Sequence, residues 1–128
     1  MGILIVDDST DDRLLIQSIL ANAGYEETFG AESAAAAFRL LGLDGPRQMT
    51  GRVDLILMDI QMPRMDGFEA IKLIRSEDKT SGIPIIAISA WASAKHKERA
   101  LAAGANEHFT KPVDLNRLLT TINRYLKS

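Results

Sequence analysis

The sequence has no cysteine, which excludes disulfide bonds, zinc–thiolate centres and thiol nucleophiles. It has no apolar run near the ~20 residues that a membrane-spanning helix needs, and it does not begin like a signal peptide. Lys and Arg number 15 against 17 Asp and Glu, a formal net charge of −2, so no overall basic charge favours nucleic acid or anionic membrane. We therefore expect a cytoplasmic protein that binds neither directly.

Apolar runs alternate with helical patterns along all 128 residues, which we expect to form a single domain, 1–128. Buried strands are predicted at residues 3–6, 55–58 and 83–88, and weaker strands at 25–30 and 108–110. Helices are predicted at residues 11–23, 32–41, 67–76, 94–103 and 115–126, with Gly24, Gly42 and Gly104 as stops and Asp114 as an N-cap. Five βα units in series predict a doubly wound α/β fold with a parallel five-stranded sheet.

One connection, residues 42–52, is longer than the usual ~2–6 residues of such units. It is either a tolerated surface excursion or a loop that binds a partner.

Polar residues follow the predicted strands where ligands bind in open α/β sheets, at the carboxyl ends. Asp7 and Asp8 follow the first run along the chain, and Asp59 follows the third. Ser89 follows the fourth run, and Lys111 follows the fifth. We expect three carboxylates, a hydroxyl and an amine to meet at one edge of the sheet.

Such a group of carboxylates needs a cation, because like charges at close range raise each other's pKa. Mg²⁺ prefers oxygen ligands, and together with Lys111 it would balance the three negative charges. A neutralised carboxylate can attack phosphorus and form an aspartyl phosphate. We hypothesise that Asp59 is this nucleophile and that Ser89 donates a hydrogen bond to the phosphoryl oxygens.

Each residue alone has a simpler explanation. An acidic pair such as Asp7 and Asp8 can merely complement a helix dipole, and Lys111 alone would be a surface lysine. We interpret Asp11 and Asp12 as first-turn charges of the helix that follows. The coincidence at successive strand ends is what favours a functional site.

The same residues carry a resemblance to a known family. The chain resembles the response regulator receiver domains of two-component systems, the CheY-like superfamily, over essentially its full length. The matching stretches are residues 3–9 (ILIVDDS), 55–63 (LILMDIQMP), 65–67 (MDG), 85–90 (IIAISA) and 111–112 (KP). The resemblance implies a flavodoxin-like sheet with strand order 2-1-3-4-5.

The resemblance also implies roles for single residues. Asp59 would be the phosphoacceptor, Asp8 a direct Mg²⁺ ligand, Asp7 a ligand partly through water, and Gln61 a ligand through its backbone carbonyl. Lys111 would be the family's site lysine.

Three neighbouring features follow in the same way. The Lys111–Pro112 peptide bond would be cis, Ser89 would be the switch hydroxyl, and Ala90 would leave room for the phosphoryl donor.

Two positions depart from the common pattern. His108 stands where many relatives have Tyr or Phe, so it is either a modified switch residue that can respond to pH or a surface histidine without that role. Trp91 either shields the phosphoryl group from hydrolytic water or packs elsewhere.

The implied function is phosphorelay signalling. A sensor histidine kinase or histidine phosphotransfer protein would phosphorylate Asp59, and the surface of the fourth helix, fifth strand and fifth helix would then switch toward a downstream effector or a homodimer. The chain would promote its own phosphorylation and dephosphorylation without being an enzyme in the ordinary sense.

Three other functions are alternatives to phosphorelay signalling. A degenerate receiver would act as a phosphorylation-independent interaction module, but such receivers usually lack one of the site residues. A flavodoxin-like FMN protein is disfavoured because the carboxylates within residues 7–12 would repel the FMN phosphate. A hydrolytic phosphatase would need a separate acid–base residue.

Overall fold

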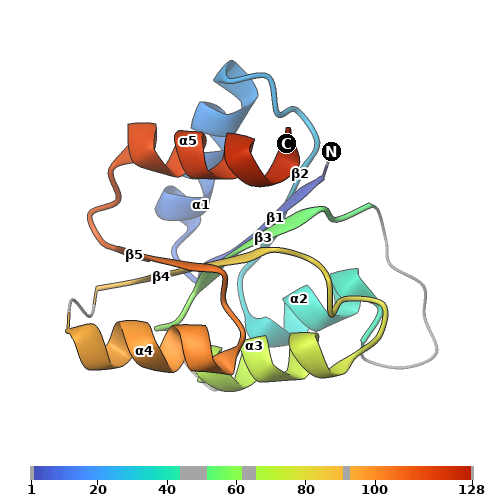
Figure 1. Ribbon diagram of the computed structural model, residues 1–128. Helices are drawn as coiled ribbons and strands as arrows, with labels where there is room; N and C mark the ends of the chain where they lie inside the picture. Colours follow the sequence, from blue (N-terminus) through green and yellow to red (C-terminus); the bar gives the residue numbers. More distant parts are fainter. Residues whose placement is uncertain (1, 44–51, 62–65, 91–92, 128) are drawn as a thin grey trace.

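The computed structural model describes residues 2–43, 52–61, 66–90 and 93–127, which form five strands alternating with five helices (Figure 1). The strands are β1 (Ile3–Val6), β2 (Thr28–Ala31), β3 (Leu55–Asp59), β4 (Ile85–Ser89) and β5 (Glu107–Thr110). The helices are α1 (Thr10–Asn22), α2 (Ala34–Leu41), α3 (Gly67–Ser76), α4 (Ala94–Ala103) and α5 (Leu115–Leu126). The predicted α/β class is confirmed.

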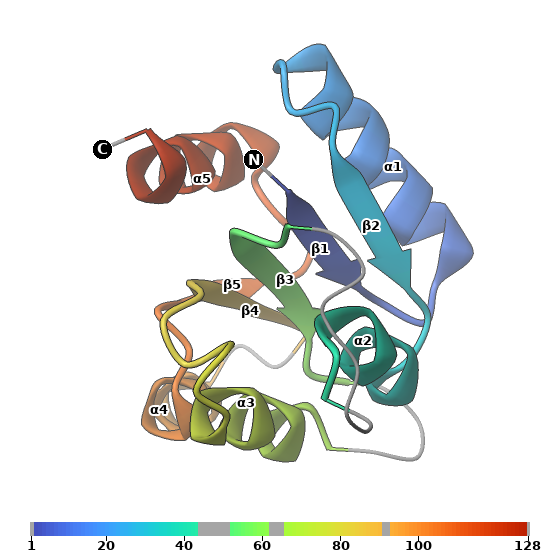
Figure 2. The ribbon, with the colours of Figure 1, turned by 90° about the vertical axis from the view of Figure 1, so that its right-hand side faces the viewer.

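The strands pair in parallel to form one sheet in the order β2-β1-β3-β4-β5, as predicted (Figure 2). β3 lies at the centre, with β1 on one side and β4 on the other. The carboxyl ends of these three strands are therefore adjacent, and residues that follow them are brought together.

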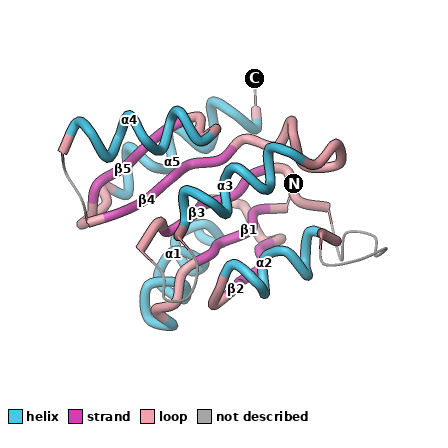
Figure 3. Tube along the Cα trace, turned by 90° about the horizontal axis from the view of Figure 1, so that it is seen from below, coloured by secondary structure: helices cyan, strands magenta, loops and turns pink. Residues whose placement is uncertain are grey.

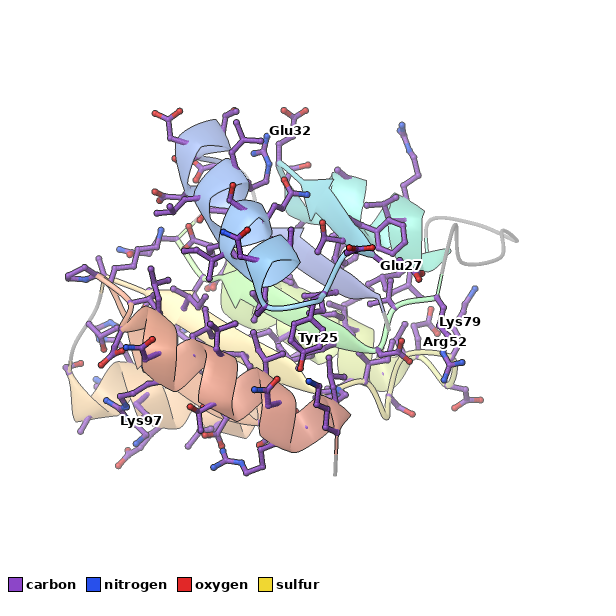
Figure 4. The ribbon with its side chains drawn as sticks, turned by 90° about the horizontal axis from the view of Figure 1, so that it is seen from above. Tyr25, Glu27, Glu32, Arg52, Lys79 and Lys97 are labelled. Atoms are coloured by element: carbon purple, nitrogen blue, oxygen red, sulfur yellow. The ribbon has the colours of Figure 1, made fainter. Side chains whose placement is uncertain are left out.

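Both faces of the sheet are covered, which explains why the central strands are apolar without alternation. Ile3 and Ile5 point to a cluster with α1 and α5, where Leu20, Leu118 and Ile122 are buried. The alternate strand residues join a second cluster with α2, α3 and α4. Figure 3 shows the sheet from the side of α2, α3 and α4, and Figure 4 shows it from the side of α1 and α5.

Short polar side chains begin the helices and fix their first residues. Ser9, Ser33 and Ser93 accept hydrogen bonds from backbone N–H groups of α1, α2 and α4. Asp114 caps α5, as predicted, by accepting from the backbone N–H groups of Asn116 and Arg117. The stops at Gly24, Gly42 and Gly104 are also confirmed, since each has a positive φ.

Gly67 brings the start of α3 against the end of β3. A Cβ at this position would lie 2.4 Å from the Cα atom of Ile60, so a side chain would push the helix away. Ile60, which directly follows Asp59, is therefore held against the start of α3.

None of the helices in the described ranges has the length and apolar composition needed to cross a membrane. The central part of the long connection, residues 44–51, lies outside those ranges.

Candidate functional site

The predicted site residues converge at the carboxyl edge of the sheet. Asp59 is the last residue of β3, Asp7 directly follows β1, and Ser89 is the last residue of β4. Lys111 directly follows β5, and its side chain returns toward β3. The sheet order places Asp59 between the other two strand ends, as its proposed role as acceptor requires.

Asp7, Asp8 and Asp59 form a candidate metal centre. One carboxylate oxygen from each lies within 4.8 Å of the others. Asp7 and Asp59 are each 4% exposed, whereas Asp8 is exposed. Carboxylate oxygens gathered at this spacing suit a hard divalent cation such as Mg²⁺, which prefers oxygen ligands and keeps part of its water.

Each buried carboxylate is oriented by hydrogen bonds. Asp59 Oδ1 accepts from the backbone N–H of Gln61 at 2.9 Å, and Asp7 Oδ1 accepts from the backbone N–H of Ser9 at 2.9 Å. Lys111 Nζ donates to Asp59 Oδ2 at 3.1 Å and lies 3.5 Å from Asp7 Oδ2. The two carboxylates therefore share one ammonium group.

The electrostatics of the site disfavour a charged Asp59. Burial raises the pKa of Asp59 to about 6, and the nearby charge of Asp7 adds to this effect. Hydrogen bonds from Gln61 and Lys111 act in the opposite direction without cancelling it. Without a cation, the site therefore holds more negative charge than its surroundings stabilise.

Lys111 has the complementary behaviour. Burial disfavours its charged form, but the hydrogen bond to Asp59 and the charges of Asp59, Asp7 and Asp12 outweigh burial and raise its pKa. Its backbone is fixed by an N–H bond to the carbonyl of Ser89 at 2.7 Å, and the Lys111–Pro112 bond is cis, as expected. The ammonium group therefore stays charged and directed at the carboxylates.

Ser89 and His108 are joined across β4 and β5. Ser89 Oγ lies 3.1 Å from His108 Nε2, and Ser89 is fully buried. Burial lowers the pKa of His108, and the charges of Lys97 and His96 lower it further. Ser89, the predicted switch hydroxyl, thus contacts His108, whose switching role stays a prediction.

Some contacts at the site were missed by sequence reasoning. The side-chain Oε1 of Gln61 accepts from the backbone N–H of Ala90 at 2.7 Å, which links the segments after β3 and β4. Arg13 donates to the backbone carbonyl of Asp7 at 2.7 Å, and Asp12 lies 3.5 Å from Lys111. Asp11 and Asp12 are first-turn charges of α1, as predicted, but Asp12 also faces the site.

Trp91, which was assigned either to shielding or to packing, lies outside the described residues. The backbone carbonyl of Gln61 stays a predicted metal ligand.

Comparisons with known proteins agree with the fold and identify the family. The family model of the response regulator receiver domain matches residues 3–123. The polar-differentiation response regulator DivK of Brucella anthropi is 34% identical over 125 residues, which cover 98% of this chain and 95% of DivK. The chain therefore belongs to the response regulator receiver domain family.

Solved structures give the same result. The chemotaxis protein CheY4 of Vibrio cholerae superposes with a TM-score of 0.85 at 31% identity, with 98% of each chain covered. The receiver domain of the sensor histidine kinase PA1611 of Pseudomonas aeruginosa has a TM-score of 0.84 at 30% identity, with 99% of this chain and 98% of that chain covered. That structure has a magnesium ion coordinated in its active site cleft. The chain is thus a receiver domain of two-component signalling, a class of signalling proteins rather than ordinary enzymes.

Proposed function

We propose that this receiver domain accepts a phosphoryl group on Asp59, in a reaction that requires Mg²⁺. Asp7, Asp8, Asp59 and the backbone carbonyl of Gln61 would hold the ion. The phosphoryl group would come from a sensor histidine kinase or a histidine phosphotransfer protein, and the reaction would take place in the cytoplasm.

One observation carries the proposal. Asp59 is buried at the centre of the carboxyl edge, within 3.1 Å of the Lys111 ammonium and within the 4.8 Å group formed with Asp7 and Asp8. A structural carboxylate would be expected to pair with one cation and to avoid two further acids. Three carboxylates beside one ammonium group leave excess negative charge, which a divalent cation would balance during phosphoryl transfer to Asp59.

The chain's own residues account for most of the chemistry. Asp59 attacks the phosphorus atom as its bond to the donor breaks, and the Gln61 N–H holds the carboxylate in a fixed orientation. One hydrogen bond holds the Lys111 ammonium to Asp59. The ammonium can therefore move from the carboxylate to a phosphoryl oxygen once the phosphoryl group has been transferred. Mg²⁺, when bound, would supply positive charge that offsets the carboxylates and the phosphoryl oxygens.

Ser89 and His108 would convert the modification into a change of surface. If Ser89 turns toward the phosphoryl oxygens, it must give up its contact with His108, and the imidazole is then free to reorient. His108 lies on β5 between α4 and α5, so this movement would alter the face that meets a downstream effector or a second copy of the domain.

The phosphorylation-independent reading is not favoured. Degenerate receivers usually lack an acidic residue, the acceptor or the lysine, whereas here Asp7, Asp8 and Asp59 lie within 4.8 Å of one another and Lys111 contacts Asp59.

Acetyl phosphate with Mg²⁺ tests the proposal directly. We expect intact-mass spectrometry to show one added phosphoryl group on the wild type and none on Asp59→Asn, with the wild-type product lost when EDTA is added before the donor. Beryllofluoride with Mg²⁺ serves as a stable mimic for measuring oligomeric state. Modification of Asp59→Asn at the wild-type rate would show that the acceptor is a different residue.

A further inference from the structure

Lys111 faces a third carboxylate that the proposed reaction does not use. Asp12, in the first turn of α1, places Oδ2 3.5 Å from Lys111 Nζ, the same distance as Asp7. The Asp12 side chain is 48% exposed and that of Lys111 is 29% exposed, so the contact lies at the rim of the site. A cavity of about 430 Å³, lined partly by Asp7, Asp12 and Lys111, opens beside it.

Asp12 lies outside the candidate metal centre. Within the described residues, the group of carboxylates close enough to share an ion consists of Asp7, Asp8 and Asp59. A divalent cation and the Lys111 ammonium would balance those three charges. The charge of Asp12 then remains unbalanced, directly beside the ammonium that must reach the phosphoryl oxygens.

We propose that Asp12 is a positioning residue that selects the phosphoryl donor: it holds the Lys111 ammonium toward α1 and repels small anionic donors, and so slows their reaction with Asp59. This inference rests on the proposed function of Asp59. It predicts that the negative charge of Asp12, rather than its size, determines how fast small anionic donors react with Asp59.

The charges in the reaction explain why the negative charge of Asp12 should slow it. The acetyl phosphate dianion approaches, a bond forms between phosphorus and an Asp59 oxygen, and the bond to the acetyl oxygen breaks with acetate leaving as an anion. Total charge is conserved, but a dianion must first come within a few ångströms of Asp12. Repulsion at this range, in a partly solvated site, amounts to about 1 kcal/mol, which corresponds to a rate factor of about five.

The test compares two neutralised carboxylates of the same helical turn. Asp12→Asn is expected to raise the second-order rate constant for acetyl phosphate about three- to tenfold, at constant ionic strength and saturating Mg²⁺. Asp11→Asn is the matched control, because Asp11 is exposed and its carboxylate forms no salt bridge and accepts no hydrogen bond among the described residues. Its rate constant should stay near that of the wild type, and Asp12→Glu, which keeps the charge, should also react slowly.

Two further readouts separate charge from structure. Phosphoramidate is a monoanion at neutral pH, so the gain from Asp12→Asn should be smaller with this donor than with acetyl phosphate. The gain should also shrink at about 1 M salt, where the screening length falls to about 3 Å. A merely structural change would alter the rates with both donors equally and independently of salt.

The outcomes are distinct. If the wild type is phosphorylated at Asp59 but Asp12→Asn reacts no faster, or if Asp11→Asn gains as much, the inference about Asp12 is wrong and the function of Asp59 stands. If the wild type is not phosphorylated by either donor, the proposed function fails and the inference fails with it.

Discussion

At the scale of the residue, Asp59 illustrates how a reactive group costs stability. It is 4% exposed and faces Asp7, and its pKa is raised from the ordinary 3.8 to about 6. A carboxyl group whose pKa is higher in the folded than in the unfolded protein favours folding at low pH. That contribution is complete below pH 3.8 and is lost as the pH rises through about 6.

Asp59→Asn should therefore stabilise the metal-free protein at neutral pH, because Asn resembles the protonated carboxyl group. We expect the free energy of unfolding at pH 7 in EDTA to rise by about 2–3 kcal/mol. The gain should diminish as the pH falls from 6 to 4, as measured by urea unfolding at several pH values.

Asp54→Asn is a control with the opposite sign. Burial alone would raise the pKa of Asp54, but hydrogen bonds from the Gly2 N–H and Arg52 outweigh it and lower the pKa. Its replacement should therefore reduce stability at pH 7. An Asp59→Asn variant less stable than wild type at pH 7 in EDTA would contradict the assigned electrostatics.

Several site residues could be predicted from the sequence because strand ends determine their position. Asp7, Asp59, Ser89 and Lys111 each follow or end an apolar run, and parallel strands bring such positions to one edge. The contacts of Asp12 with Lys111 and of Gln61 with Ala90 could not be predicted, since they depend on how helices and connecting segments pack in three dimensions.

At the scale of the element, α4 packs on the core through small side chains, and a polar side chain of α3 holds the segment that follows it. Ala100 and Ala103 are its buried residues, and both are small. Arg75 of α3 reaches past the end of α4 and donates to the Gly104 carbonyl at 2.8 Å and to Asn106 Oδ1 at 2.7 Å. It also donates to the carbonyls of Ser81 and Ile83, so one side chain joins α3, α4 and the approaches to β4 and β5.

Arg75→Ala should destabilise the protein by about 2–4 kcal/mol, because it leaves several carbonyl groups without their donor. Amide hydrogen exchange should increase most in α4 and in residues 104–106. Arg124→Ala is the matched control, since Arg124 is 60% exposed and pairs with Glu107 at the surface. We expect it to cost less than about 1 kcal/mol. Equal losses for the two variants would show that Arg75 does not join these elements.

Element types were predicted correctly, while several boundaries differ for local reasons. α2 was predicted from residue 32 but begins at Ala34, because Ser33 is its N-cap. β4 was predicted from residue 83 but begins at Ile85, after Pro84, which has no N–H for the ladder. β2 was predicted at 25–30 but lies at Thr28–Ala31, since Tyr25 still bonds to the carbonyl of Leu20 at the end of α1. β5 begins at Glu107, one residue before its prediction.

At the scale of the whole molecule, ion binding and folding are linked. An ion that binds the folded chain alone adds stability, about 2.7 kcal/mol at one hundred times its dissociation constant. Mg²⁺ should therefore raise the melting temperature of the wild type relative to EDTA. Asp8→Asn should lose most of this increase, because Asp8 supplies one of the three grouped oxygens without being buried.

Asp11→Asn provides the comparison for this experiment, because it removes a nearby charge that lies outside the group. It should keep the increase seen with Mg²⁺. A similar rise in Asp8→Asn would place the ion elsewhere in the molecule.

The two ends of the described chain lie away from the carboxylates of the candidate metal centre. β1 starts the sheet at Ile3, and α5 runs back across the strands, so that Asn123 accepts a hydrogen bond from Tyr25 beyond the end of α1 (Figures 1 and 4). Both ends of the described chain therefore lie toward the side where the strands begin. A fluorescent label or fused reporter attached at either end would leave the path of a phosphoryl donor to Asp59 unobstructed.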